Sequence, residues 1–395
     1  MTDSVQGTGI HEFLAARGGP FYELQHRLKL LHHNALNVGR RTLIFVALAW
    51  GVPFILTLPG SFSLAQDQNS FLSDPAVWAK FIIGIAAFIF AEQQVERGLR
   101  LKLTQFLRAP LIAPAAVPAA AKAVNTALKR RDSHIGEIIC LILAAIAAVG
   151  SFLNFHTISE SSWAVTHLPE GNAITLAGWW CVLVSLPLFV FLFTRGIWRH
   201  FVWAQLLRKI ASLDLRLVAT HPDGKAGLAF LADYPNAYVF FVFGISSAVA
   251  AALAKHVLQT GVDAKTFSMI MAGWLVIVMA LFAYPLSAFS KPLARLKEQG
   301  LLMLGAQATR YQRQAERKTA GQNLVANDPA EAQQQVDVED PSKLFEATRK
   351  LSTMLISRKA VVPVAAAALL PFAAAGATQL PYKEVFSVLK KLLLL

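Results

Sequence analysis

The stretch THPDGKAG (residues 220–227) stands at the centre of a basic segment, residues 195–236. The run before this segment (176–194) and the run after it (237–253) carry no charged residue. Each run is about as long as a helix needs to be to cross a bilayer. The segment is therefore predicted to be an aqueous-side connector in a membrane protein, and the rest of the chain repeats this alternation.

The composition excludes an ordinary soluble domain. Of 395 residues, 55% are hydrophobic and only 15% are charged, and the apolar residues cluster in charge-poor blocks. The net charge is +13, which in a soluble protein would suggest a nucleic-acid partner. Here Lys and Arg lie at the ends of apolar runs and no recognition motif accompanies them, so we expect anionic lipids as partners and no nucleic acid.

The charge-poor blocks predict six transmembrane helices, and the charges between them predict the orientation. The N-terminal arm (1–41) and the connectors 97–135, 195–236 and 291–359 hold 31 Lys and Arg, whereas the three alternate loops hold 2. By the positive-inside rule, the N-terminus and the large connectors are cytoplasmic. The predicted all-α membrane domain covers 42–290, with spans at about 42–58, 78–96, 136–155, 176–194, 237–253 and 267–289.

The spans are predicted to pair as three hairpins. Trp78, Trp179 and Trp274 each stand near the outer start of an even-numbered span whose other end is basic. Internal repetition would explain this pattern. So would the general preference of Trp and Arg for opposite membrane interfaces, and the sequence leaves both explanations open.

Three further segments flank the membrane domain. The arm contains an amphipathic pattern over Phe21–Asn37, and the first span reads as a retained anchor. Residues 291–359 are predicted to form a cytoplasmic helix and a flexible linker, the linker over Gln312–Pro341. Residues 360–395 are expected to form a membrane-associated, re-entrant hairpin, because the uncharged run 360–382 contains three prolines.

Ionisable residues at the span ends are the first candidate site. Glu92 falls deep in the second span, where a carboxylate is costly unless it is paired or hydrated. Glu92 and Gln93 could line a cytoplasm-facing vestibule, or the span could end early and leave Glu92 among the headgroups. At the end of the fourth span, lipid-headgroup contacts are expected for four basic residues: Arg195, Arg199, Arg208 and Lys209.

The THPDGKAG stretch is the second candidate site, and two interpretations stay open. In one, His221 and Asp223 bond backbone groups and fix a turn, since Pro222 and the Asp-Gly pair are turn signals. In the other, the polar residues face a vestibule and bind an ion, a headgroup or a small anion. The vestibule residues would be His221, Asp223, Gly224, Lys225 and Gly227, and only His221 ordinarily titrates near neutrality.

Residues 213–231 also resemble a known pattern. The run from His221 to Leu231 is similar to a His-Pro-Asp-x-x-Gly-Gly-Leu-x-Phe-Leu signature of uncharacterised multi-pass bacterial inner-membrane proteins. Gly227 matches the second glycine of the pair, and Ala226 departs from the first. The resemblance implies a bacterial inner-membrane location and adds no chemistry, because that family has no assigned activity.

The motifs point away from an enzyme. The sequence has no phosphate-binding loop, dinucleotide fingerprint, nucleophile elbow or metalloprotease motif, and no cofactor or metal site is predicted. The spans are poor in the buried ionisable groups that ion-coupled carriers use. We therefore expect a passive, channel-like or transport protein, forming homo-oligomers. The alternative is a membrane scaffold or sensor whose basic cytoplasmic face binds a partner or anionic lipid.

Overall fold

A computed structural model gives the structure of the chain and describes residues 15–31, 36–58, 70–157, 163–168, 171–260, 264–327, 339–377, 390 and 392. Within these ranges seven helical segments are long and apolar enough to span a membrane, the architecture of an all-α multi-pass membrane protein. Six of the segments contain the six predicted spans. The seven segments are Val38–Thr57, Pro75–Arg108, Pro114–Thr157, Leu176–Ala211, Ala229–Lys255, Lys265–Ala320 and Arg358–Ala377.

Several segments combine more than one kind of helix. The first segment consists of α3 (Val38–Val46), η2 (Ala47–Gly51) and α4 (Val52–Thr57), and the second of α5 (Pro75–Val77), η4 (Trp78–Gly84) and α6 (Ile85–Arg108). The third consists of η5 (Pro114–Ala116), α7 (Val117–Arg131) and α8 (His134–Thr157). The fourth consists of α9 (Leu176–Trp180), η6 (Cys181–Ser185) and α10 (Leu186–Ala211). The fifth segment consists of η7 (Ala229–Tyr238) and α11 (Val239–Thr260). The sixth consists of α12 (Ala264–Leu286), η8 (Ser287–Phe289) and α13 (Ser290–Ala320), and the seventh is α16 (Arg358–Ala377).

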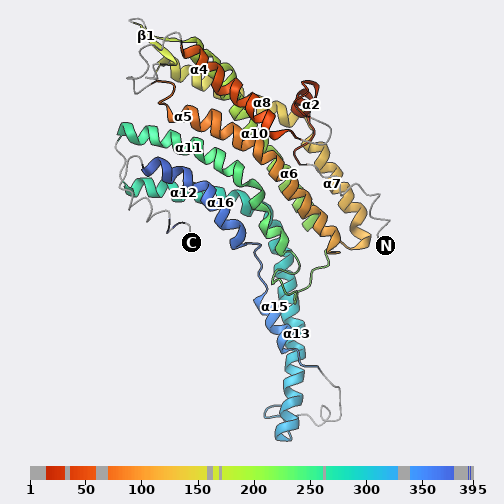
Figure 1. Ribbon diagram of the computed structural model, residues 1–395. Helices are drawn as coiled ribbons and strands as arrows, with labels where there is room; N and C mark the ends of the chain where they lie inside the picture. The colour runs from red at the N-terminus through yellow and green to blue at the C-terminus, as the bar shows by residue number, and fades with distance from the viewer. Residues whose placement is uncertain are drawn as a thin grey trace.

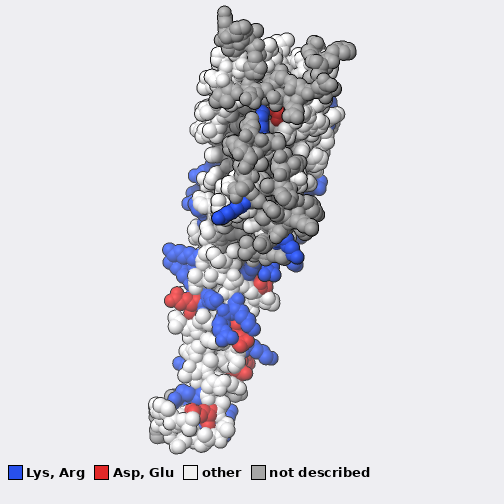
Figure 2. Space-filling view, turned by 90° about the vertical axis from the view of Figure 1, so that its left-hand side faces the viewer, with Lys and Arg blue, Asp and Glu red and all other residues white. Residues whose placement is uncertain are grey.

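The helices form an elongated bundle with two different ends (Figure 1). At one end, here called the hairpin end, strands β1 (Val165–Leu168) and β2 (Gly171–Ile174) pair antiparallel. At the other, the stalk end, α13 and α15 (Ser342–Lys350) pack together and project from the bundle as a stalk. Figure 2 shows Lys and Arg gathered where the bundle meets the stalk and along the stalk, and among the described residues nearer the hairpin end few charged side chains are seen on this face.

The seventh segment adds a helix long and apolar enough to span a membrane to the six that were predicted. Its described residues form one continuous helix, α16, which packs against α11 and α12, where a re-entrant hairpin was expected. Pro363 and Pro371 lie inside this helix. Its buried face consists largely of small residues, which permit the close approach that neighbouring membrane helices need. Residues 378–389 of the expected hairpin lie outside the described residues.

Two peripheral predictions also change. Of the helix expected over Phe21–Asn37, the described residues form α2 (Pro20–Arg27), and Lys29 follows it with a φ of 55°. Residues 32–35 lie outside the described residues. The linker expected over Gln312–Pro341 is helical as far as Ala320, because α13 runs on as a solvated helix. Residues 328–338 of that linker lie outside the described residues.

Backbone hydrogen bonds join three connectors at the stalk end. The Arg216 amide donates to the Leu111 carbonyl at 2.7 Å, and the Ser352 amide donates to the Gly224 carbonyl at 2.9 Å. The Lys297 amine, on α13, donates to the Leu351 carbonyl at 2.8 Å. These bonds hold the base of the stalk against the bundle.

Candidate functional site

Three π-helical turns lie next to one another toward the hairpin end. The turn η2 packs against both η4 and η6, which belong to three different segments. A π-helical turn carries an extra residue, and such turns occur frequently at functional sites. The turns η4 and η6 place Lys80, Phe81 and Cys181 on the wall of one cavity.

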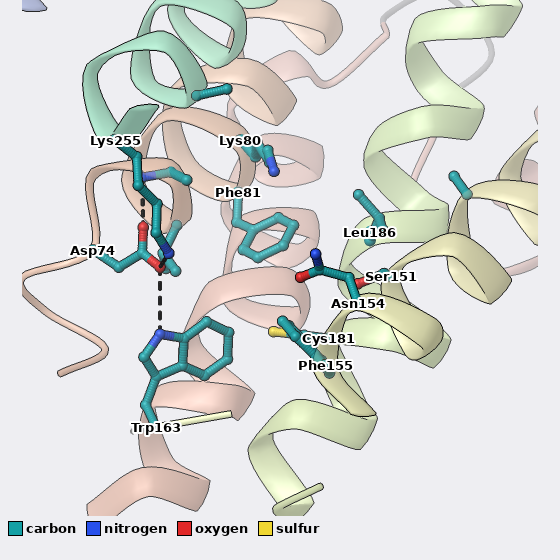
Figure 3. Close-up of a pocket in the computed structure, with 14 residues that line it drawn as sticks. Asp74, Lys80, Phe81, Ser151, Asn154, Phe155, Trp163, Cys181, Leu186 and Lys255 are labelled. Carbon is teal, nitrogen blue, oxygen red and sulfur yellow. Dashed lines mark hydrogen bonds and ion pairs between the residues drawn. The ribbon is translucent and has the colours of Figure 1, made fainter. Parts of the chain in front are cut away.

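The cavity has a volume of about 440 Å³ and lies between α5–η4, α8, α10 and α11 (Figure 3). Its apolar wall includes Phe81, Phe155 and Trp163. Ser151 and Asn154 from α8 add a hydroxyl and an amide. The cavity is therefore of a size and polarity suited to a small polar solute.

Three charged side chains set the electrostatics of the cavity. Asp74 caps α5, accepting from the Ala76 amide at 2.9 Å, and accepts from the Trp163 indole at 3.4 Å. The Lys255 ammonium lies 3.9 Å from the same carboxylate. The Lys80 amine points toward the cavity and has no hydrogen bond or ion pair to any other described residue. Two ammonium groups thus face one carboxylate, and the excess positive charge favours an anion.

Four phenylalanines close the bundle below the cavity. Phe88 lies 5.4 Å from Phe189, 6.1 Å from Phe193 and 5.2 Å from Phe241, measured between ring centroids. Gly84 allows this packing, because a Cβ there would lie 2.5 Å from the Phe189 ring. This phenylalanine cluster (Phe88, Phe189, Phe193 and Phe241) separates the cavity from the charged groups nearer the stalk end.

Those charged groups form a buried ion-pair network centred on Glu92. The Glu92 carboxylate lies 2.6 Å from both the Arg41 and the Arg195 guanidinium, and Arg195 also contacts Glu137 at 3.1 Å. The Arg41 side chain is 1% exposed and that of Arg195 is 3% exposed. The network joins α3, α6, α8 and α10, so each charge is compensated by a partner from another helix.

The N-terminal segment, residues 15–19, covers this network at the stalk end. The Arg199 guanidinium donates to the carbonyls of Ala16 and Gly18, at 2.6 and 3.2 Å. Arg17 pairs with Glu96 at 3.0 Å. Ala15 and Ala16 are buried and border a void of about 40 Å³ that Glu92 and Arg195 also line. The segment therefore packs over the side of the network that faces the stalk end.

The residues predicted to act at the span ends lie in different parts of the structure. Glu92 lies in the network, whereas Gln93 lines a groove between α6 and η7. Arg195 and Arg199 lie inside the protein, where Arg195 contacts the carboxylates of Glu92 and Glu137 and Arg199 donates to two backbone carbonyls. Arg208 and Lys209 are exposed, as lipid contact requires, and Arg208 stacks 4.0 Å above the Tyr284 ring.

The THPDGKAG stretch forms a tight loop organised by Asp223. Its carboxylate accepts from the amides of Lys225 at 2.8 Å, Gly227 at 3.1 Å and Ala229 at 3.0 Å. Burial raises the pKa of the Asp223 carboxyl, but these N–H groups outweigh burial and hold it below its usual value. The loop geometry thus matches the turn-forming interpretation of the stretch.

The other residues of the loop have backbone conformations and contacts that fit the turn. Gly224 and Gly227 have φ angles of 64° and 90°, and Ala226 adopts 56°, in the left-handed region that favours glycine. The His221 ring lies beside the Asp223 carboxylate at 2.8 Å and is 42% exposed. The Lys225 amine donates to the Ile356 carbonyl. All of these residues lie at the stalk end, away from the cavity.

The loop supplies a direct prediction. Replacing Asp223 with alanine removes three hydrogen bonds to a carboxylate and is expected to destabilise the protein by about 1–2 kcal/mol. Because the folded pKa is depressed, the stabilisation by Asp223 is present above the unfolded pKa and is lost as the pH falls through the folded pKa. Thermal unfolding in detergent as a function of pH measures both effects. Equal acid sensitivity of wild type and D223N would contradict this role.

Sequence reasoning missed the cavity residues. Lys80 falls at the start of the predicted span 78–96, and Asp74 and Lys255 fall in the loops between predicted spans, so no pattern singles them out. The one local signal is the Asp-Pro pair at 74–75, which marks a helix start. Within the described residues no group of three His, Cys, Asp or Glu side chains could hold a metal ion, and both cysteines are free and buried.

Comparisons with known proteins return no match, neither among protein-family models nor among curated proteins nor among solved structures.

Proposed function

We propose that the protein is a passive transport protein for a small anion and that the lysine-lined cavity is its entry site. The hairpin end would face the outside and the stalk the cytoplasm, since most Lys and Arg lie toward the stalk. A bacterial inner membrane and a homo-oligomer remain parts of this proposal.

The observation that carries the proposal is the charge of the cavity. The Lys80 amine makes no hydrogen bond or ion pair with any other described residue, so among the cavity groups it would gain most from a bound anion. Lys255 shares Asp74 at 3.9 Å, a distance at which an anion can compete with the carboxylate. The Asn154 amide and the Ser151 hydroxyl can donate hydrogen bonds to the same solute.

Two barriers would close the path beyond the cavity. The phenylalanine cluster excludes a hydrated ion, because rings 5.2–6.1 Å apart leave no room for water between them. The N-terminal segment over the ion-pair network is the second barrier. The described state would thus be open toward the hairpin end and closed toward the stalk end, and transport would require the phenylalanine rings to separate.

A flux assay tests the proposal. Purified protein in liposomes should transport a small anion (chloride, nitrate, phosphate or a short carboxylate) faster than protein-free liposomes do. It should transport sodium and potassium no faster than those liposomes. Flux of cations alone, or of no ion in this set, would contradict the proposal.

Deletion of the N-terminal segment that covers the ion-pair network gives a second prediction. Deleting residues 1–19 is expected to raise anion flux several-fold, because the contacts of Ala16, Arg17 and Gly18 with the bundle are lost. R199Q, which loses the hydrogen bonds to Ala16 and Gly18, should raise flux less. Initial flux rates at equal protein density measure both. A folded deletion variant with unchanged flux would show that the segment is no barrier.

The alternative function is a scaffold or sensor, and the stalk is what favours it. Large apolar side chains are exposed on and beside the stalk: Leu302 is 70%, Met303 68% and Leu324 79% exposed. Lys and Arg side chains also lie along the stalk (Figure 2). If anion flux is absent, this function would be favoured by a partner protein that the wild type captures stoichiometrically. The partner should be lost when Leu302 and Met303 are both changed to serine.

A further inference from the structure

The lysine-lined cavity is much larger than an inorganic anion requires. Its volume is about 440 Å³, whereas one water molecule takes about 30 Å³ in the liquid. An inorganic anion such as chloride or nitrate has the size of one or a few water molecules, so it would fill only a small part of this space. The volume lies instead within the range of pockets that bind organic ligands.

The apolar wall of the cavity is rigid and partly open to a ligand. The Trp163 ring packs at nearly a right angle against Phe71 and Phe155, with ring centroids 5.2 and 6.0 Å apart. The Trp163 indole N–H is fixed by its hydrogen bond to Asp74. Phe155 and Leu186 are half-buried, and both line the cavity. An apolar ligand body can therefore be buried on a preorganised surface.

The charged groups of the cavity favour a ligand with one negative charge. The Lys80 amine makes no hydrogen bond or ion pair with any other described residue, whereas the Lys255 ammonium lies 3.9 Å from Asp74. Figure 3 shows the Lys80 amine and the Asn154 amide directed toward the same part of the cavity, beside the Phe81 ring. One carboxylate can accept from both groups. A second negative charge in the cavity would be repelled by the Asp74 carboxylate.

We propose that the cavity binds a monocarboxylate with an apolar body of a few carbon atoms. The carboxylate accepts hydrogen bonds from Lys80 and Asn154, and the apolar body lies on Phe81, Phe155 and Leu186. This inference rests on the proposed function, because it names the class of anion that the lysine-lined cavity admits. An inorganic anion would leave the apolar wall in contact with water, and a dicarboxylate would bring its second charge toward Asp74.

Isothermal titration calorimetry of the full chain in detergent tests the ligand class independently of transport. Butyrate has two more methylene groups than acetate and is expected to bind about tenfold more tightly, since each buried methylene contributes roughly a factor of four. Chloride and succinate should bind no more tightly than acetate. Butyramide, which lacks the charge, should bind at least about tenfold more weakly than butyrate. Equal affinities of acetate and butyrate, or tightest binding of chloride or succinate, would overturn the inference.

Variants separate the two parts of the site. F155A should reduce the preference for butyrate over acetate from about tenfold to roughly threefold, and L186A gives the same test if F155A does not fold. K80M should weaken binding of both carboxylates and leave the preference in place. F201A is the matched control, because Phe201 is 42% exposed on α10 outside the cavity, and it should change neither. A preference that survives unchanged in both F155A and L186A would refute the apolar contact.

Flux into liposomes separates this inference from the proposed function. Rates are compared after subtraction of the rate in protein-free liposomes, which butyric acid also crosses. If butyrate binds with the expected preferences but no anion is transported, transport is refuted and the ligand class stands. If chloride is transported as fast as butyrate, the ligand class is refuted and anion transport stands.

Discussion

Replacing Lys80 with methionine is expected to reduce anion flux about tenfold to hundredfold. The substitution keeps the unbranched apolar stem and removes only the ammonium, which makes no hydrogen bond or ion pair with any other described residue. A charge-assisted hydrogen bond contributes roughly 1.5–3 kcal/mol, and each 1.4 kcal/mol is a factor of ten. Because Lys80 donates no hydrogen bond to the described structure, K80M should fold as well as the wild type.

Matched variants test the specificity of this loss. K80R keeps the positive charge and should retain most of the flux. K129M removes a lysine from an exposed position on α7 and should change nothing. Initial anion flux into liposomes, normalised to folded protein, measures all three. Full flux in K80M would show that the cavity is not on the transport path.

Replacing Arg195 with methionine is the second large expected effect, and it concerns stability. Arg195 bridges Glu92 and Glu137 at 2.6 and 3.1 Å with its side chain 3% exposed. Removing one partner from a buried ion pair leaves an uncompensated charge, and the expected cost is about 3–5 kcal/mol. Denaturation in detergent, followed by circular dichroism, measures the change in the free energy of unfolding.

Two comparisons show whether the cost comes from burial. R208M removes an exposed arginine that stacks on Tyr284, and it should cost no more than about 1 kcal/mol. The double variant R195M/E137Q also removes the Glu137 charge that loses its ion-pair partner in R195M, and it should be more stable than R195M alone. If R195M is as stable as R208M, Arg195 does not hold the helices together.

The sequence predicted the membrane class well because apolarity is a local property. All six predicted spans fall within helices long enough to cross a bilayer. The segment α16 was read as a hairpin because prolines and alanines weaken any local signal for a helix. What stabilises it is its packing against α11 and α12, which no local pattern reports.

The candidate site was less predictable because it depends on contacts between distant segments. The sequence singled out Glu92 as an unusual carboxylate, but its partner Arg41 is 51 residues away and no local pattern links the two. Arg195, at a predicted span end, reads as an interface residue until the neighbouring helices are placed. The π-helical turns beside the cavity have no sequence signature. For the loop around Asp223, by contrast, turn-forming residues adjacent in sequence were sufficient.

The reversal potential of the protein in a planar bilayer tests the central claim most directly. Under a tenfold salt gradient, a perfectly anion-selective pathway gives about 59 mV with the sign set by the anion. We predict a potential of that sign for the wild type and a value nearer zero for K80M. A reversal potential of cation sign, or one unchanged in K80M, would contradict the assignment of the lysine-lined cavity as an anion entry site.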